Sequence, residues 1–166
     1  SKVIDVVTFD DAFTDKIKDP LDVSVVIMAG GKGTRMEPFT HVLPKPLIPI
    51  KNKTVIEHII SQFTDYSIED FYLTLNFKSG IIKAFFEELN PDYNVTYLEE
   101  MMPLGTASSL QLLPDTIKKP FFVTNCDTLI NVDLHELYDF HISGGYEITL
   151  VASAIKYKIP YGTCLL

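Results

Sequence analysis

Patterns of buried strands and amphipathic helices alternate along the chain from Val23 onward. The run VSVVIMA (23–29) is almost wholly apolar and rich in β-branched residues, which is typical of a strand buried on both faces. TVIEHIISQF (54–63) repeats its apolar residues every three to four positions, and Thr54 with Glu57 makes a capping box, so this segment predicts a helix. The remaining predicted elements are strands at 71–77, 95–99, 120–125 and 146–153 and helices at 81–89, 106–113 and from Asp133 to Phe140.

Strands that alternate with helices of about ten residues predict a mostly parallel sheet built from right-handed βαβ units. We therefore expect an α/β, three-layer αβα domain of the Rossmann-like type over residues 23–166. Residues 1–22 carry six Asp and show no steady period, so we interpret them as a linker or the tail of an upstream domain. The sequence stops at YGTCLL (161–166), where another strand would open, and this predicts a C-terminally truncated domain.

The composition is that of a folded protein without covalent cross-links. Hydrophobic residues make up 46% of the chain, charged residues make up 22%, and there are two cysteines, which excludes a disordered chain and a disulfide scaffold. Cys126 and Cys164 lie far apart in the sequence, and we interpret them as reduced thiols of a cytoplasmic protein. No apolar run approaches the roughly 20 residues of a membrane helix, and the N-terminus lacks a signal-peptide pattern, so we expect no membrane partner.

The charge distribution favours a small anionic ligand. The net charge of −8 argues against a nucleic-acid partner, because proteins that bind nucleic acids usually present a basic face. Residues 32–53 are a local exception, since five basic residues and one acid, Glu37, leave this segment with a charge of about +4. A confined positive segment in an acidic protein suits a small polyanion better than a long one.

The basic residues belong to the segment AGGKGTRMEPFTHVLPKPLIPI (29–50), directly after the first predicted strand. Its glycines let backbone N–H groups approach phosphate oxygens, and Thr34 and Arg35 add donors that suit phosphate. Three prolines place Lys45 in a stiff, extended stretch that fixes the direction of its ammonium group. The spacing matches neither a P-loop nor the dinucleotide fingerprint. The alternative is a glycine turn followed by a proline-rich surface loop.

The pattern GG-x-GTR-x-x-P-x-T-x-x-x-PKP-x-x-PI at residues 30–50 resembles the signature of the sugar-1-phosphate nucleotidyltransferases, the nucleoside-diphosphate-sugar pyrophosphorylases. The resemblance extends from Val23 to the end of the sequence. It implies that the glycine loop binds a nucleoside triphosphate, that Arg35 stabilises the α-phosphoryl transition state and that Lys45 contacts the phosphates. The implied cofactor-binding residues of this segment are Ala29, Gly30, Gly31, Gly33 and Thr34.

Two other segments are similar to binding stretches of this family. LEEMMPLGTASSL (98–110) resembles the stretch that recognises base and ribose, which implies that Glu100 faces the base and that Gly105 lies against the nucleoside. The same residues also fit a strand-to-helix turn with Thr106 as the helix N-cap. Tyr161-Gly162 resembles the family's sugar pocket, where the Gly162 backbone would meet a sugar hydroxyl, and the alternative there is a turn that enters a strand.

Asp127 follows the predicted strand at 120–125. Its position beyond the carboxyl end of a buried strand is one where an acid can hold Mg²⁺ against phosphates. In the family that the chain resembles, the corresponding Asp is a metal ligand, so we expect Asp127 to be a catalytic and metal-binding residue and Mg²⁺ to be the cofactor. A turn-forming Asp is the alternative.

The resemblance implies a reaction between a nucleoside triphosphate and a sugar 1-phosphate that gives a nucleoside-diphosphate sugar and pyrophosphate. Family frequency favours GTP or dTTP, while the sugar and the presence of a homo-oligomer are left open. Arg35, Lys45 and Mg²⁺ would act by positioning and charge neutralisation. The alternatives are a nucleotide-binding or regulatory module without turnover and a nucleotidyltransferase with a non-sugar acceptor such as phosphocholine. We expect the 166-residue fragment itself to be inactive, because only Gly162 represents the acceptor side.

Overall fold

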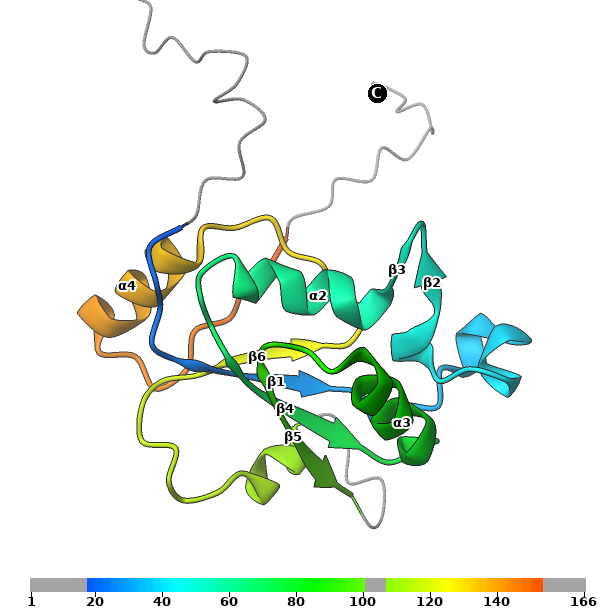
Figure 1. Cartoon of the computed structure of the whole chain (residues 1–166). Coiled ribbons are helices and arrows are strands. Elements are labelled where there is room, and N and C mark those ends of the chain that lie inside the picture. The colour runs from blue at the N-terminus through cyan, green and yellow to red at the C-terminus, as the bar shows by residue number, and fades with distance from the viewer. Residues whose placement is uncertain (1–17, 101–106, 154–166) are drawn as a thin grey trace, which may run out of the picture. The chain divides into compact units, whose positions relative to one another are not determined.

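The computed structural model describes residues 18–100 and 107–153 and is shown in Figure 1. The chain forms two compact units, residues 1–131 and 132–166. A four-stranded parallel sheet with the strand order β5-β4-β1-β6 is the centre of the first unit, and it confirms the predicted α/β class. The sheet strands are β1 (Ser24–Met28), β4 (Asp70–Leu75), β5 (Asn94–Glu99) and β6 (Phe122–Asn125), and a separate antiparallel pair consists of β2 (Pro49–Ile50) and β3 (Lys53–Thr54).

Strand β1 is a buried inner strand of the sheet. It pairs with β4 on one side and with β6 on the other, so that Val26 lies opposite Tyr72 and Val123. Val25, Val26 and Ile27 are fully buried, as a continuous apolar run predicts for a strand that is covered on both faces. The β1 backbone is therefore fixed up to the point where the glycine-rich segment begins.

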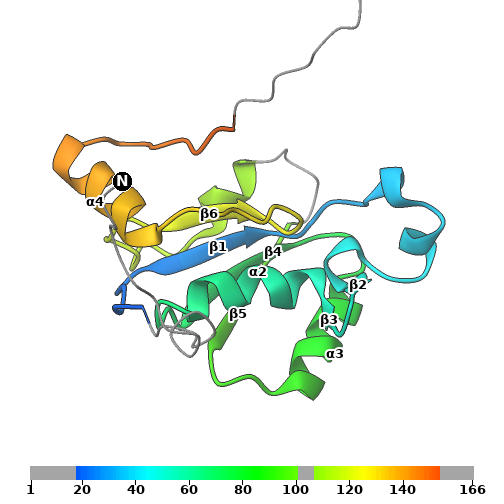
Figure 2. The same ribbon diagram turned by 90° about the horizontal axis from the view of Figure 1, so that it is seen from above.

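Helices α2 (Val55–Thr64) and α3 (Ser79–Leu89) pack on the same face of the sheet (Figure 2). The predicted capping box of α2 is present, because the Thr54 side chain accepts from the Glu57 N–H while the Glu57 carboxylate accepts from the Thr54 N–H. The apolar stripe of α2 is buried along its whole length, from Val55 to Phe63. Among the described residues, no helix is both long enough and apolar enough to cross a membrane.

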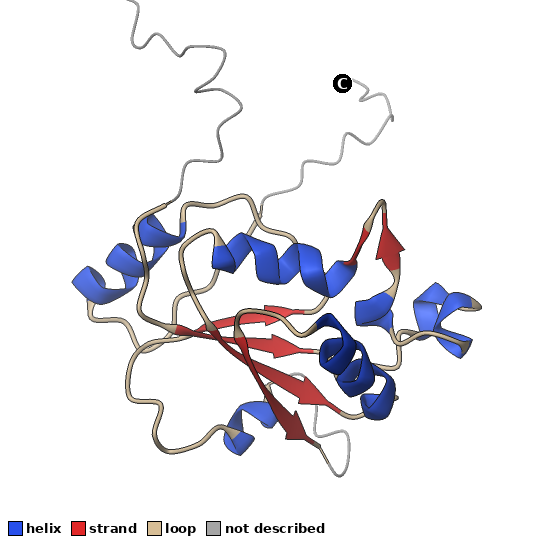
Figure 3. Cartoon of the chain, viewed as in Figure 1, coloured by secondary structure: helices blue, strands red, loops and turns tan. Residues whose placement is uncertain are grey.

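A short 3₁₀ segment, Ser108–Leu112, lies on the opposite face of the sheet (Figures 2 and 3). The short helix predicted over 106–113 is present in the described part of that range, as a 3₁₀ helix rather than an α-helix. Two consecutive serines lower the helix propensity, and Pro114 follows at once, so the segment is short enough for the tighter 3₁₀ geometry. Ser109 is nevertheless buried, which shows that the segment packs against its unit.

The second unit contains α4 (Leu134–Gly144), which Asp133 caps by accepting from the backbone N–H groups of His135 and Glu136. The helix ends at the predicted pair Gly144-Gly145. The strand that we predicted at 146–153 is absent, and Ile148 and Leu150 are largely exposed. An alternating segment forms a strand only when a neighbouring strand pairs with it through backbone hydrogen bonds. The described residues supply no such neighbouring strand here.

The packed part of the first unit includes residues before Val23. Leu21 is buried, and its N–H donates to the Tyr66 carbonyl at 2.9 Å. The Lys18 ammonium donates to the Tyr66 hydroxyl at 2.9 Å and lies over the same ring. Residues 18–22 thus contact the turn that follows α2. These residues belong to the range 1–22 that we interpret as a linker or the tail of an upstream domain.

Candidate functional site

The carboxyl ends of β4, β1 and β6 meet at one edge of the sheet, and the strand order reverses beside β1. Ligands of open α/β sheets bind at such a reversal, beyond the carboxyl ends of the strands. The chain places two predicted segments there. The segment 29–50, which we call the signature loop, leaves the end of β1, and Asp127 follows the end of β6 two residues after Asn125.

The signature loop contains three short 3₁₀ turns, Thr34–Met36, Phe39–His41 and Lys45–Leu47, and ends in strand β2. The extended stretch that we predicted around Lys45 is therefore wrong. Pro44 and Ile48 are extended, but Lys45 itself begins a turn, because Pro46 suits the start of a helical turn, where no N–H is required. Pro46 and Leu47 are buried, so the turn that carries Lys45 is anchored in the core.

Lys45 and Asp127 form an ion pair, although 82 residues separate them in the sequence. The Lys45 side chain is 20% exposed and the Asp127 side chain is 43% exposed, so the pair lies at the surface of the site. The Cys126 N–H donates to the Met28 carbonyl at 3.2 Å, which continues the β1–β6 ladder to within one residue of Asp127. Two of the three predicted catalytic residues, Lys45 and Asp127, are therefore adjacent in space.

Gly33 is the tightest point of the signature loop. Its φ of +66° lies in the left-handed region, which favours glycine. A Cβ atom at this position would stand 2.9 Å from Cγ2 of Thr40 and 3.1 Å from Cβ of Lys45. Thr40 is buried, and its hydroxyl donates to the Gly33 carbonyl at 3.1 Å. The glycine loop and the lysine turn are thus packed directly against each other.

Gly30 and Glu100 also come together, at the ends of β1 and β5. A Cβ atom at Gly30 would lie 3.5 Å from Oε1 of Glu100 and 3.4 Å from Cβ of Asn76. The Asn76 side-chain amide donates to the Glu100 carbonyl at 2.7 Å, and the Glu100 N–H donates to the Leu75 carbonyl at 2.8 Å. The main chain of Glu100 is held from two sides, and its carboxylate lies beside the first glycine of the loop.

Other predicted site residues are not drawn into these contacts. Thr34 and Arg35 are exposed on the first turn of the signature loop, and Arg35 makes no hydrogen bond or ion pair with the residues that the structure describes. Ala29 is buried, and its N–H donates to the Thr74 carbonyl at 3.0 Å. Gly105 and Gly162 lie outside the described residues.

Cys126, the residue before Asp127, is buried. Burial raises the pKa of its thiol to about 11, although the nearby Lys45 ammonium opposes that increase. The thiol is therefore protonated at neutral pH, and a protonated, buried thiol is chemically inert.

Three residues near this site were not singled out from the sequence. Asn76 directly follows β4, so the rule that points to the carboxyl ends of strands applies to it as well as to the segments that we selected. Thr40 stands inside the signature pattern, but its buried hydroxyl could not be read from the spacing. Lys78 donates to the carbonyls of Thr40 and His41, and no sequence pattern that we used indicates such a contact.

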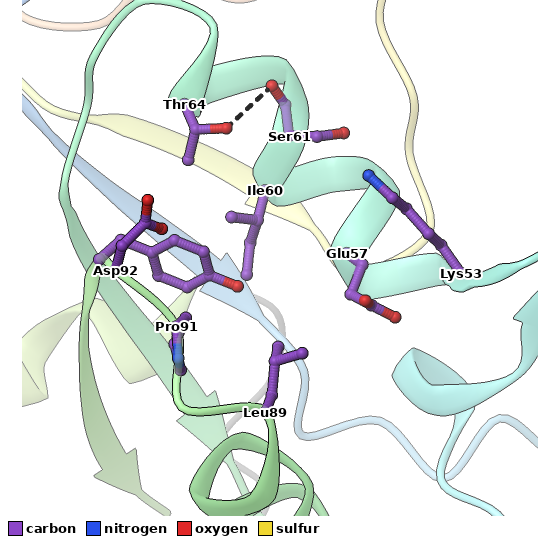
Figure 4. Close-up of a pocket in the computed structure, with 9 residues that line it drawn as sticks. Lys53, Glu57, Ile60, Ser61, Thr64, Leu89, Pro91 and Asp92 are labelled. Carbon is purple, nitrogen blue, oxygen red and sulfur yellow. Dashed lines mark hydrogen bonds between the residues drawn. The ribbon is translucent and has the colours of Figure 1, made fainter.

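A hollow of about 250 Å³ lies elsewhere in the first unit, between α2 and the turn after α3 (Figure 4). Three of its polar side chains are already engaged within α2. Glu57 caps α2, and the hydroxyls of Ser61 and Thr64 donate to carbonyls one turn earlier in the same helix. None of its lining residues belongs to the signature loop, so we assign the candidate site to the sheet edge.

The fold and the site together define an α/β protein that places a glycine-rich loop, a lysine and an aspartate beyond the carboxyl ends of a parallel sheet. Residues 24–164 match the family of nucleotidyl transferases, and the chain belongs to that family. The sequence prediction of a sugar-1-phosphate nucleotidyltransferase relative is confirmed at this level.

Curated relatives agree with this membership. The chain is 35% identical over 142 residues to a mannose-1-phosphate guanyltransferase of Saccharomyces cerevisiae and 34% identical over 145 residues to one of Neurospora crassa. These matches cover 82% and 84% of this chain but only 39% and 40% of the relatives. The chain therefore spans about two fifths of the length of these proteins.

Solved structures share the fold. HddC from Yersinia pseudotuberculosis, in a complex with GMP-PN, superposes with a TM-score of 0.63 at 27% identity, over 72% of this chain and 54% of that chain. A putative glucose-1-phosphate thymidylyltransferase from Bacillus anthracis gives a TM-score of 0.63 at 23% identity, over 73% of this chain and 50% of that chain. The Rossmann-like α/β architecture is thus the one that these proteins have.

Proposed function

We propose that the full-length protein transfers a nucleotidyl group from a nucleoside triphosphate to a sugar 1-phosphate and releases pyrophosphate. The observation that carries the proposal is the contact of Lys45 with Asp127 at the carboxyl edge of the sheet. One residue is a cation suited to phosphate, and the other is a hard oxygen donor suited to Mg²⁺. Their convergence from segments 82 residues apart supports a shared ligand better than two separate surface roles.

In the proposed reaction an oxygen of the sugar phosphate attacks the α-phosphorus of the triphosphate in line. The new P–O bond forms as the bond to the β-phosphate oxygen breaks, and pyrophosphate leaves with the electron pair. The nucleophile is already ionised, so no residue has to remove a proton. The protein's contribution is positioning and charge neutralisation, which we assign to Arg35 and Lys45.

The residues present fit a Mg²⁺ ion that arrives together with the nucleotide. Among the described residues no cluster of three or more His, Cys, Asp or Glu side chains could hold a metal alone. Mg²⁺ is commonly bound by one or two carboxylates together with substrate phosphates, and Asp127 is a partly exposed carboxylate at the required edge. When bound, the ion would supply neutralisation of phosphate charge.

We propose GTP as the nucleotide and a hexose 1-phosphate, first of all mannose 1-phosphate, as the acceptor. The Glu100 carboxylate offers two acceptor oxygens next to Gly30. Guanine presents two adjacent donors, N1–H and the N2 amino group, that match a carboxylate, whereas thymine and uracil present one N–H between two carbonyls. The names of the relatives, which are mannose-1-phosphate guanyltransferases, favour the same pair of substrates.

The test is a pyrophosphate-release assay of the full-length protein with each of four nucleoside triphosphates and a panel of sugar 1-phosphates and phosphocholine. We expect turnover with GTP and mannose 1-phosphate that requires Mg²⁺ and that Arg35→Ala lowers mainly in kcat, because Arg35 would act on charge that develops during transfer. Nucleotide binding without pyrophosphate release for any acceptor would favour the binding-module alternative. Turnover with phosphocholine alone would reassign the acceptor.

A further inference from the structure

Lys78 connects helix α3 to the signature loop. It stands directly before the first residue of α3, and its ammonium donates to two consecutive carbonyls of the loop, Thr40 at 3.1 Å and His41 at 2.7 Å. The same ammonium lies 5.2 Å from the centroid of the Phe77 ring. The two carbonyls and the aromatic face hold the ammonium in one position, because both kinds of contact stabilise a cation.

The backbone of Lys78 has a conformation that residues with a side chain rarely adopt. Its φ is +56°, in the left-handed region, and its side chain makes no capping bond to α3. Left-handed backbone is unfavourable for a residue with a side chain and persists where surrounding contacts require it. At Lys78 these contacts are the two bonds from the ammonium to the loop and the bond that the Lys78 carbonyl accepts from the Ile81 N–H.

Thr40 links Lys78 to the glycine-rich part of the signature loop. The Thr40 carbonyl accepts from Lys78, while its buried hydroxyl donates to the Gly33 carbonyl at 3.1 Å. Gly33 in turn packs against Lys45, because a Cβ atom there would stand 3.1 Å from Cβ of Lys45. Four residues thus connect the start of α3 with the lysine that pairs with Asp127.

We propose that Lys78 is a positioning residue that sets the geometry of the signature loop, and through it of Gly33 and Lys45, for binding a nucleoside triphosphate. The inference rests on the proposed function for the identity of the ligand. It does not make Lys78 a ligand contact, because its donors are directed at loop carbonyls.

The experiment compares Lys78→Met with Lys83→Met in the full-length protein. Lys83 is a matched control, because it lies on α3 and its ammonium pairs with Glu99 rather than with the loop. Its replacement by Met removes one cation, as Lys78→Met does. Two quantities are measured: the affinity for a non-hydrolysable GTP analogue with Mg²⁺ and, in the protein without nucleotide, the hydrogen exchange of the turn amides of His41 and Val42.

We expect Lys78→Met to lower the affinity about tenfold, which is the typical effect of losing a hydrogen bond to a charged group, and to speed exchange of the turn amides. Lys83→Met should change neither quantity. Lys78→Arg should restore most of both, because a guanidinium can donate to two carbonyls. Lys78→Gly should keep the thermal midpoint, since glycine tolerates the backbone, yet should lose affinity as Lys78→Met does.

Three results would overturn the proposal. The first is unchanged exchange of the turn amides in Lys78→Met, which together with a loss of affinity would make Lys78 a direct ligand contact. The second is faster exchange without a loss of affinity. The third is equal behaviour of the Lys78 and Lys83 variants. Failure of the wild-type protein to bind any nucleoside triphosphate would instead contradict the proposed function, and the exchange data would still decide whether Lys78 orders the loop.

Discussion

Gly31 and Gly33 stand two residues apart in the signature loop, but their surroundings differ. A Cβ atom at Gly31 would meet nothing within 4 Å, while one at Gly33 would press against Thr40 at 2.9 Å on a left-handed backbone. The protein's own packing therefore requires glycine at 33 and leaves position 31 open. This contrast separates the two roles that a glycine-rich loop can have, which are to fold tightly and to let a ligand approach.

Gly33→Ala should destabilise the folded protein by about 2 kcal/mol, because a left-handed alanine costs roughly 1–2 kcal/mol and the contact with Thr40 adds to that cost. Urea denaturation measures the change. Gly31→Ala is the control, and its stability should stay within about 0.5 kcal/mol of the wild type. Equal losses for both variants would show that the loop packing is not what requires Gly33.

Gly31→Ala should instead weaken nucleotide binding in the full-length protein, because a methyl group on this open position would stand where phosphate oxygens approach the backbone. Titration with a non-hydrolysable nucleoside triphosphate measures the effect, which we expect to be about tenfold or more. Wild-type affinity in Gly31→Ala would show that the phosphates do not bind beside this part of the loop.

At the scale of elements, β4 contains a group that the fold leaves unsatisfied. The Thr74 hydroxyl is buried and has no hydrogen-bond partner among the described residues. A buried, unpaired hydroxyl opposes folding, since it gives up its bonds to water without replacement.

Thr74→Val should therefore stabilise the protein by about 1 kcal/mol, because valine keeps the branched shape and removes the unpaired group. The midpoint of urea denaturation should rise. Thr96→Val, on the exposed side of β5, is the matched control and should change little. A loss of stability in Thr74→Val would mean that the hydroxyl has a partner, such as a buried water.

The elements with the clearest patterns were the ones that the sequence predicted correctly. Strand β1 is a buried β-branched run, and α2 combines a capping box with an apolar stripe, so local information was sufficient. The prediction of a strand at 146–153 was wrong, because the alternation of apolar and polar residues does not indicate whether a partner strand is present. In the site, the carboxyl-end rule predicted that the signature loop and Asp127 lie at one edge, while the contacts of Lys78 with Thr40 depend on side-chain geometry that no spacing encodes.

The stability of the whole molecule should depend on pH in the alkaline range. Burial raises the pKa of Tyr93 from 10 to about 12, with Glu57 and Asp92 adding to the increase, and raises that of Cys126 from 9 to about 11. Both groups hold their protons more tightly in the folded state. Their contribution is fully present below about pH 9, and it is lost as the pH rises to about 12, because the unfolded chain releases these protons first.

The free energy of unfolding should thus fall between pH 9 and pH 12, and Tyr93→Phe should flatten the fall between pH 10 and pH 12. Phenylalanine keeps the edge-on contact with Phe71, so the variant should match the wild type at pH 7 to within about 1 kcal/mol. Urea denaturation over this pH series measures both slopes. Parallel curves for the two proteins would remove Tyr93 from the explanation.

The ion pair of Lys45 with Asp127 would couple the two ligands that we propose for this site, a phosphate group on Lys45 and Mg²⁺ on Asp127. A phosphate that takes Lys45 leaves the carboxylate without a counter-ion, and a divalent cation that takes Asp127 releases the ammonium. Each ligand alone has to break the pair, whereas the two together exchange one ion pair for two. Metal and nucleotide should therefore bind cooperatively, and by thermodynamic reciprocity each should raise the affinity of the other by the same factor.

Nucleotide affinity measured with Mg²⁺ and with a chelator gives that factor, which we expect to be about tenfold in the wild type and smaller in Asp127→Asn, where only the contact of Mg²⁺ with the phosphates remains. The same factor in both proteins would show that the pair does not couple the ligands. A site with this coupling would respond more strongly to the complex of nucleotide and Mg²⁺ than to either ligand alone.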